Sequence, residues 1–223
     1  MNKTRILKVN PLNPQEEYLK EAGETIRRGG LVVIPTETVY EIALNSLNKE
    51  AIERLHKIKQ CSVGKVFSLH IADKKKIEEY ATEIPLYAYK LIYRLIPGPL
   101  TLVLKAKDKK EDTIGIRMPD NEVALKVISY SNVPVFCCSA NTSGTPPPKS
   151  SSDVIKDLDG LVDLILDSGE TRLGKESTVV DCTDKEPKIL QQGVLDEALI
   201  KETAKKKSVL FICTGNSCRS VMA

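Results

Sequence analysis

Short apolar runs alternate with segments of helical periodicity along this chain. Leu31-Val32-Val33-Ile34 is a continuous apolar run, which suits a strand that is buried on both faces. Ahead of it, apolar residues recur at helical spacing, at Tyr18, Leu19, Ala22 and Ile26. Asn13-Pro14-Gln15-Glu16 predicts the start of that helix, with Asn13 as its cap and Pro14 at its first position, and Gly29-Gly30 predicts its end.

The same alternation continues toward the end of the chain. Further helices are predicted at Ala51–Lys59, Lys75–Ala81, Leu86–Ile96, Glu122–Ser131, Asp153–Leu158 and Leu195–Lys206. Further strands are predicted at Val66–Ile71, Leu100–Ala106, Thr113–Met118, Val135–Ser139, Leu164–Leu166, Ser177–Asp181 and Lys188–Leu190. A polar loop is predicted at Pro35–Asn48, and a long surface loop at Asn141–Ser152. Strands that alternate with helices predict an α/β fold with helices flanking a sheet.

Two of these strands, Leu100–Ala106 and Thr113–Met118, are joined by the short charged segment Lys107–Asp112 and should form a hairpin. A hairpin makes antiparallel neighbours, whereas connections through helices favour parallel ones. We therefore expect a twisted mixed sheet with both parallel and antiparallel pairs.

The composition narrows the class of protein but does not identify a function. The 223 residues are 41% hydrophobic and 28% charged, as in soluble globular proteins, and suit one substantial domain with a short appendage. Because the longest apolar runs are too short to cross a bilayer, we expect a cytoplasmic protein. The net charge of +3 does not by itself argue for nucleic acid. Six cysteines in a chain of this size predict free thiols, and two histidines without a Cys-x-x-Cys leave little for zinc.

Five segments carry polar residues that could bind a ligand, and the two at Pro35–Tyr40 and Ser139–Gly144 directly follow predicted strands, where α/β proteins commonly bind ligands. They are Pro35–Tyr40, Pro97–Thr101, Thr113–Pro119, Ser139–Gly144 and Gly174–Asp181. Strand alternation places Arg117 on one face with Thr113 and Gly115, where its guanidinium suits a carboxylate or phosphate. Taken singly, each segment is explained about as well by ordinary turn chemistry or, for Arg117, by a solvated side chain.

Taken together and in order, these segments resemble the YrdC family of threonylcarbamoyl-adenylate synthases. The matching landmarks are Gly30–Tyr40, Lys59, Leu69-His70-Ile71, Pro97–Thr101, Ile116-Arg117-Met118-Pro119, Ser139–Gly144 and Ser177–Asp181. The resemblance covers nearly everything from Pro14 to Gly193. It implies a YrdC-like fold and the formation of threonylcarbamoyl-AMP and pyrophosphate from L-threonine, bicarbonate or CO₂, and ATP. That product serves the threonylcarbamoyladenosine modification of tRNA at adenosine 37 (t6A37).

The resemblance also implies two sets of binding residues. Threonine would be held by Thr36, His70, Arg117, Ser177 and Thr178, with Arg117 on its carboxylate. ATP would face Lys59, Lys65, Thr113, Ser139 and Asn141, with the cations on the phosphates. Tyr40 would close the pocket near the carbamate, so that Tyr40 and Lys59 would lie closest to the chemistry. Mg²⁺ would be bound mainly through phosphates and water, without a dedicated carboxylate cage.

Three positions depart from the family pattern. Glu41 stands where the family usually has a glycine, and its charge is unfavourable beside the proposed triphosphate site unless the side chain is turned outward or paired. Cys61 and Gln191 stand where arginines are usual, and each lost phosphate contact is worth on the order of 1.5–3 kcal/mol. We therefore expect threonine recognition to survive better than nucleotide recognition.

The last residues carry a different motif. Cys213 and Arg219 have Cys-x5-Arg spacing behind the apolar run Val209–Ile212, an arrangement that lets N–H groups and a guanidinium surround a phosphate. It resembles the opening of low-molecular-weight protein tyrosine phosphatases and related arsenate reductases. We expect a YrdC-like domain at 1–204 and, at 205–223, a linker with the truncated start of a phosphatase-like domain in which Cys213 is inactive.

Two alternatives to the synthase activity stay open. A catalytically degenerate module could use the same surface to bind tRNA or double-stranded RNA or to regulate a partner, and the missing cations favour it. A fragment of a phosphatase fusion is the third interpretation. The oligomeric state cannot be inferred from this sequence.

Overall fold

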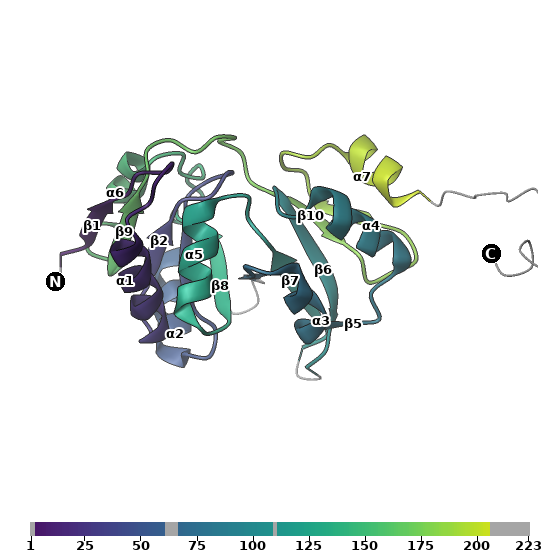
Figure 1. Cartoon of the computed structure of the whole chain (residues 1–223), viewed down its shortest axis with the longest axis horizontal. Helices are drawn as coiled ribbons and strands as arrows, with labels where there is room; N and C mark the ends of the chain where they lie inside the picture. The colour runs from purple at the N-terminus through teal and green to yellow at the C-terminus, as the bar shows by residue number, and fades with distance from the viewer. Residues whose placement is uncertain (1–2, 61–66, 109–110, 206–223) are drawn as a thin grey trace, which may run out of the picture.

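Eleven strands form one mixed, twisted sheet in the computed structural model, which describes residues 3–60, 67–108 and 111–205 (Figure 1). Ten of them follow one another across the sheet in the order β1 (Arg5–Lys8), β9 (Leu164–Asp167), β2 (Val32–Ile34), β3 (Glu41–Asn45), β8 (Val135–Ser139), β4 (Ser68–His70), β7 (Thr113–Arg117), β6 (Leu100–Ala106), β10 (Thr178–Asp181) and β11 (Lys188–Gln191). The short β5 (Ala81–Thr82) pairs with β6. The pairs β1–β9, β2–β9, β4–β7 and β6–β10 are parallel and the others are antiparallel, which confirms the predicted mixed sheet.

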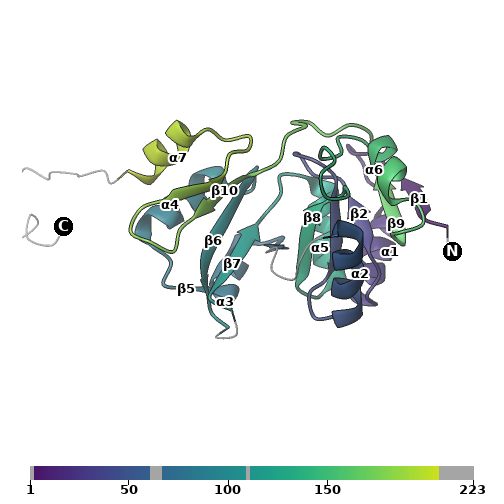
Figure 2. The ribbon, with the colours of Figure 1, turned by 180° about the vertical axis from the view of Figure 1, so that it is seen from behind.

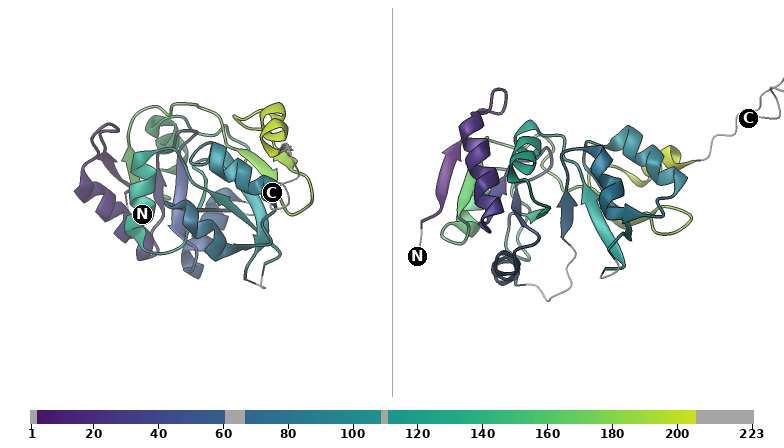
Figure 3. Two further views of the ribbon diagram at one scale, coloured as in Figure 1. Left: turned by 45° about the vertical axis from the view of Figure 1, so that its right-hand side comes forward. Right: turned by 60° about the horizontal axis from the view of Figure 1, so that its bottom comes forward.

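Helices pack on both faces of this sheet. Helices α1 (Glu16–Arg27) and α5 (Glu122–Ser131) pack on one face over β2, β3 and β8, and α2 (Lys49–Lys59) and α6 (Ser151–Leu158) pack on the opposite face (Figures 1 and 2). Toward the other end, the short 3₁₀ helix Lys74–Lys76 leads into α3 (Ile77–Tyr80), and α4 (Leu86–Leu95) packs against α7 (Glu197–Ala204). Figure 3 shows β1 and α7 at opposite ends of the molecule.

Most predicted elements are confirmed to within a few residues, but the start of α1 is wrong. The helix begins at Glu16, after the extended Gln15, and Asn13 does not cap it. The carboxamide of Asn10 accepts hydrogen bonds from the backbone N–H groups of Leu12 and Asn13. These bonds close a separate turn ahead of the helix, so α1 starts two residues later than predicted, at Glu16 instead of Pro14.

The predicted polar loop at Pro35–Asn48 is also wrong, because it contains the buried strand β3. The hydroxyl of Thr36 donates to the carbonyl of Val39 at 2.7 Å and accepts from the N–H groups of Thr38 and Val39, which reverses the chain. Glu41 then pairs with Ile34 in an antiparallel ladder. The strands β1 and β5 were not predicted, and the segment predicted as one helix at Lys75–Ala81 is divided between the 3₁₀ turn, α3 and β5.

No helix in the described part of the chain is long and apolar enough to span a membrane. Cys61, Lys65, Cys213 and Arg219 lie outside the described residues, so the predictions for them stay predictions.

Candidate active site

Strand register gathers polar side chains from distant parts of the sequence on one face of the sheet. Directly paired residues point to the same face, and here the pairs include Glu41 with Ser139, His70 with Arg117, and Arg117 with Thr101. Helices α1 and α5 cover one part of this face. Beyond them lies a cavity of about 490 Å³, whose lining includes Glu41, Lys59, Ser68, Thr101, Thr113, Cys137, Ser139, Glu176, Ser177, Asp181 and Gln191.

The guanidinium of Arg117 is the centre of a buried polar cluster, with 1% of the residue exposed. Its Nη1 lies 2.6 Å from Oε1 of Glu41, and its Nη2 lies 3.0 Å from Oε1 of Glu37 and 2.7 Å from the hydroxyl of Thr38. Burial by itself lowers the pKa of Arg117, but the charges of Glu41 and Glu37 outweigh it and raise the pKa. Arg117 is therefore a charged group that is already paired inside the protein.

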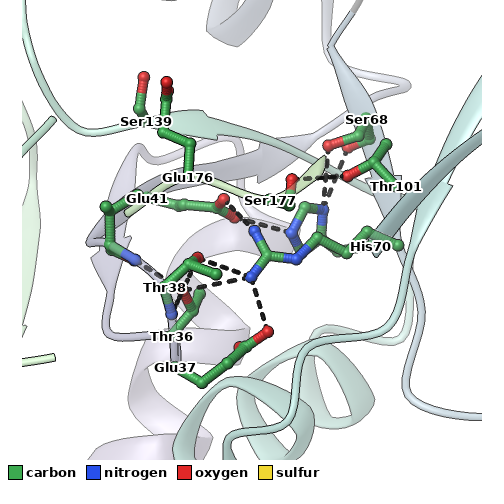
Figure 4. Close-up of polar contacts among 12 residues, drawn as sticks. Thr36, Glu37, Thr38, Glu41, Ser68, His70, Thr101, Ser139, Glu176 and Ser177 are labelled. Atoms are coloured by element: carbon green, nitrogen blue, oxygen red, sulfur yellow. Dashed lines mark hydrogen bonds and ion pairs between the residues drawn. The ribbon is translucent and has the colours of Figure 1, made fainter. Parts of the chain in front are cut away.

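Glu41 also contacts His70, another residue that was predicted to bind threonine. Oε2 of Glu41 and Nε2 of His70 lie 2.7 Å apart, and Figure 4 shows the carboxylate and the ring turned toward each other. Burial by itself raises the pKa of Glu41, but the charges of Arg117 and His70 outweigh it and lower the pKa to about 2. The sequence placed this charge beside the triphosphate. The structure instead pairs it with two of the predicted threonine-binding residues, His70 and Arg117.

The structure brings together most of the predicted threonine-binding residues. Thr36, His70 and Arg117 belong to the buried cluster, and the hydroxyl of Ser177 lies 2.9 Å from that of Thr101 on the cavity wall. Thr178 is different, because strand alternation turns it away from Val179 and the cavity. Its hydroxyl donates to the carbonyl of Leu195 at 2.7 Å and accepts from two backbone N–H groups of the turn at 193–195.

The turn at 193–195 lies against the backbone of the site. A Cβ on Gly193 would lie 2.3 Å from the carbonyl carbon of Ser177 and 2.4 Å from the carbonyl oxygen of Glu176. Only glycine allows this approach, so Gly193 helps to fix the position of Ser177.

The predicted nucleotide residues meet at the C-terminal end of α2. The ammonium of Lys59 donates to the carbonyls of Ser139 and Asn141, at 2.7 and 2.8 Å, and lies 2.9 Å from Oδ1 of Asn141. Thr113 also lines the cavity. Gln191 is exposed and contacts Glu176. In the described part of the wall, Lys59 is the only cation, whereas Glu41, Glu176 and Asp181 are anions.

Tyr40 is fully buried, and its hydroxyl is engaged away from the Arg117 cluster. The hydroxyl donates to the carbonyl of Gly169 at 2.7 Å and accepts from the N–H of Ser168. Burial raises the pKa of Tyr40, so the phenol stays protonated. In this conformation Tyr40 anchors the loop that follows β9, and its role near the carbamate stays a prediction.

One group of described residues has the composition of a metal site. Ligand atoms of Glu41, His70 and Cys137 lie within 4.8 Å of one another, and all three residues are buried. A thiol and an imidazole do not suit Mg²⁺, which prefers oxygen ligands. Burial raises the pKa of Cys137 well above its ordinary value, so the thiol is protonated. Since the guanidinium of Arg117 already lies on Glu41, the cation at this carboxylate is the arginine.

The sequence did not single out Glu37, Thr38 and Cys137 as individual site residues. Glu37 and Thr38 stood within the quoted motif Pro35–Tyr40, so their position was available, but their bonds to Arg117 depend on a strand 79 to 80 residues away. Cys137 could have been found from the alternation of β8, which puts it on the same face as Ser139.

Over most of its length, the chain is similar to known proteins. Residues 24–193 match the family model for Sua5, YciO and YrdC proteins, described as "Telomere recombination". The threonylcarbamoyl-AMP synthase of Pyrococcus abyssi is 41% identical over 188 residues, which cover 81% of this chain and 55% of that protein.

Two solved structures share the fold. The crystal structure of P. abyssi Sua5 complexed with L-threonine has a TM-score of 0.85 and 39% identity, covering 90% of this chain and 61% of that one. Escherichia coli YciO has a TM-score of 0.77 and 31% identity, covering 86% and 97%. This chain therefore spans little more than half the length of the P. abyssi relative and nearly all of YciO.

Proposed function

This chain belongs to the Sua5/YciO/YrdC family, and from that premise we propose that it is a threonylcarbamoyl-AMP synthase. It would convert L-threonine, bicarbonate or CO₂, and ATP into threonylcarbamoyl-AMP and pyrophosphate, for t6A37 modification of tRNA in the cytoplasm. The observation that supports this best is the buried cluster of Thr36, His70 and Arg117, which Glu41 joins to a cavity whose wall includes Ser177, in a chain 41% identical to a protein of that name.

The reaction requires mainly positioning and charge stabilisation. The threonine carbamate attacks the α-phosphorus of ATP through a carboxylate oxygen, a new O–P bond forms, and the bond to the β-phosphate oxygen breaks to release pyrophosphate. Arg117 would bind the threonine carboxylate, and Ser177 and Thr36 would offer hydroxyl groups to the amino acid. Lys59, Ser139 and Asn141 would lie at the nucleotide, joined by Lys65 and Thr113.

Mg²⁺ would neutralise charge on the ATP phosphates. Glu176 and Asp181 on the cavity wall are carboxylates of the kind that Mg²⁺ prefers, and they would hold it together with phosphate oxygens and water.

Pyrophosphate release tests the proposal. We expect release from ATP that requires both threonine and bicarbonate, each omitted in turn, and that falls strongly in Lys59→Met. Lys57→Met is the control, because Lys57 is exposed on the same helix. Release that depends on neither threonine nor bicarbonate would contradict the activity.

A second candidate is a non-catalytic module that binds tRNA or double-stranded RNA. It is favoured by the cavity wall, where three carboxylates face one lysine among the described residues and would disfavour a triphosphate. Salt-sensitive tRNA binding without threonine-dependent pyrophosphate release would select it. We also propose that residues 1–204 form the functional unit and that residues 205–223 belong to a separate, phosphatase-like part of the sequence.

A further inference from the structure

Glu41 occupies the one side of the Arg117 cluster that faces the cavity. Glu37, Glu41 and Thr38 all contact the guanidinium, but of these only Glu41 also lines the cavity. Its Oε1 accepts a hydrogen bond from Arg117 at 2.6 Å, and its Oε2 lies 2.7 Å from Nε2 of His70. A carboxylate of the protein thus lies where a carboxylate arriving from the cavity would meet Arg117 and His70.

The charges of the cluster oppose the binding of a second anion at this position. Arg117 is one cation between two buried carboxylates, so the guanidinium is neutralised before any ligand arrives. A second anion brought to the same Nη1 would have to displace Glu41 or lie beside it, and like charges in a buried site repel strongly. A ligand without a carboxylate meets no such repulsion.

We propose that Glu41 is a specificity-determining residue that competes with the carboxylate of the bound amino acid for Arg117 and His70. The inference rests on the proposed function, since it takes threonine as the occupant of this pocket. Its consequence is a site that binds free threonine weakly and distinguishes it poorly from L-threoninamide, which keeps the ammonium and the hydroxyl but has no negative charge.

Calorimetric titration with L-threonine and L-threoninamide tests this proposal. In the unmodified chain we expect the two dissociation constants to agree within about threefold. In Glu41→Gln, which keeps the size of the side chain and removes its charge, threonine should bind roughly 10 to 100 times more tightly while threoninamide changes little. Glu122→Gln, on the exposed side of α5, is the matched control and should behave as the unmodified chain.

The outcomes separate this inference from the proposed function. A preference for threonine above about 30-fold in the unmodified chain overturns the inference, and this needs no variant to fold. An unchanged ratio in a folded Glu41→Gln, with threonine-dependent pyrophosphate release intact, overturns the inference alone. Failure of every variant to bind either compound, without such release, overturns the inference together with the function.

Discussion

At the scale of the residue, Arg117, Glu37 and Glu41 are buried as charged groups that pair with one another. Arg117 illustrates what the sequence could and could not predict. Strand alternation predicted that its guanidinium would bind an anion, and the structure provides anions from Glu37 and Glu41. The pairing itself was not predictable, because Glu41 lies 76 residues away and its strand was predicted as a loop.

Replacing Arg117 by leucine should destabilise the fold. Two buried carboxylates would lose their cation, and breaking a buried pair in this way costs about 3–5 kcal/mol. We expect the free energy of unfolding in urea to fall by that amount. In Arg172→Leu, which breaks an exposed ion pair with Asp120, it should fall by less than about 1 kcal/mol. Equal losses in the two variants would contradict the account of the cluster.

The lowered pKa of Glu41 predicts a specific dependence of stability on pH. Since the folded pKa of about 2 lies below the ordinary 4.5, the pairing stabilises the fold above pH 4.5 and is lost as the pH falls toward 2. The groups that face Glu41 are Arg117, His70 and Cys137, with Glu37 across the guanidinium. The linkage corresponds to about 3 kcal/mol.

Unfolding measured at several pH values checks this prediction. The unmodified chain should lose stability steeply between pH 4.5 and 2, and Glu41→Gln should lose less over the same interval. Parallel curves for the two proteins would show that Glu41 does not carry the effect.

Helices and strands with strong periodicity were predictable, and the exceptions have physical causes. Strands β6 and β8 and helix α5 have their predicted bounds, because apolar runs and turn residues frame them. Strand β3 was missed, since Glu41 and Asn45 interrupt its apolar character and are buried through partners elsewhere in the fold.

The contact between α1 and α5 depends on a glycine. A Cβ on Gly23 would lie 2.7 Å from the carbonyl carbon of Tyr130 and 2.8 Å from the nitrogen of Ser131. Alanine normally stabilises a helix relative to glycine. Here Gly23→Ala should instead lower the free energy of unfolding by about 1–3 kcal/mol, because backbone atoms must move apart.

Urea unfolding of Gly23→Ala beside Glu17→Ala measures this effect. Glu17 is exposed on the same helix, so its replacement should change stability by no more than about 0.5 kcal/mol. A stabilised Gly23→Ala protein would mean that the two helices do not pack this closely.

Lys59 connects α2 to the loop that follows β8. Lys59→Met keeps the length of the side chain but leaves the carbonyls of Ser139 and Asn141 without this donor, at a cost of about 1–3 kcal/mol. We expect a lower midpoint of urea unfolding for Lys59→Met than for Lys57→Met. Equal midpoints would show that the lysine does not hold this loop.

At the scale of the whole molecule, the fold class and the family could be predicted from the order of the motifs, but the arrangement of the site could not. The sheet places β3 next to β8, and β4 between β8 and β7, so that residues from Glu41 to Gln191 line one cavity. No periodicity in the sequence encodes which strands become neighbours. The sequence therefore suggested candidate residues for the site, but it did not show that Glu41 pairs with two of them, Arg117 and His70.

The most direct test of the proposed synthase activity is mass spectrometry of the product. The protein is incubated with ATP, L-threonine, Mg²⁺ and ¹³C-labelled bicarbonate. Our account predicts threonylcarbamoyl-AMP that carries the labelled carbon and that disappears when threonine is omitted. Unchanged ATP, or AMP without a threonylcarbamoyl adduct, from a folded protein under these conditions would contradict it.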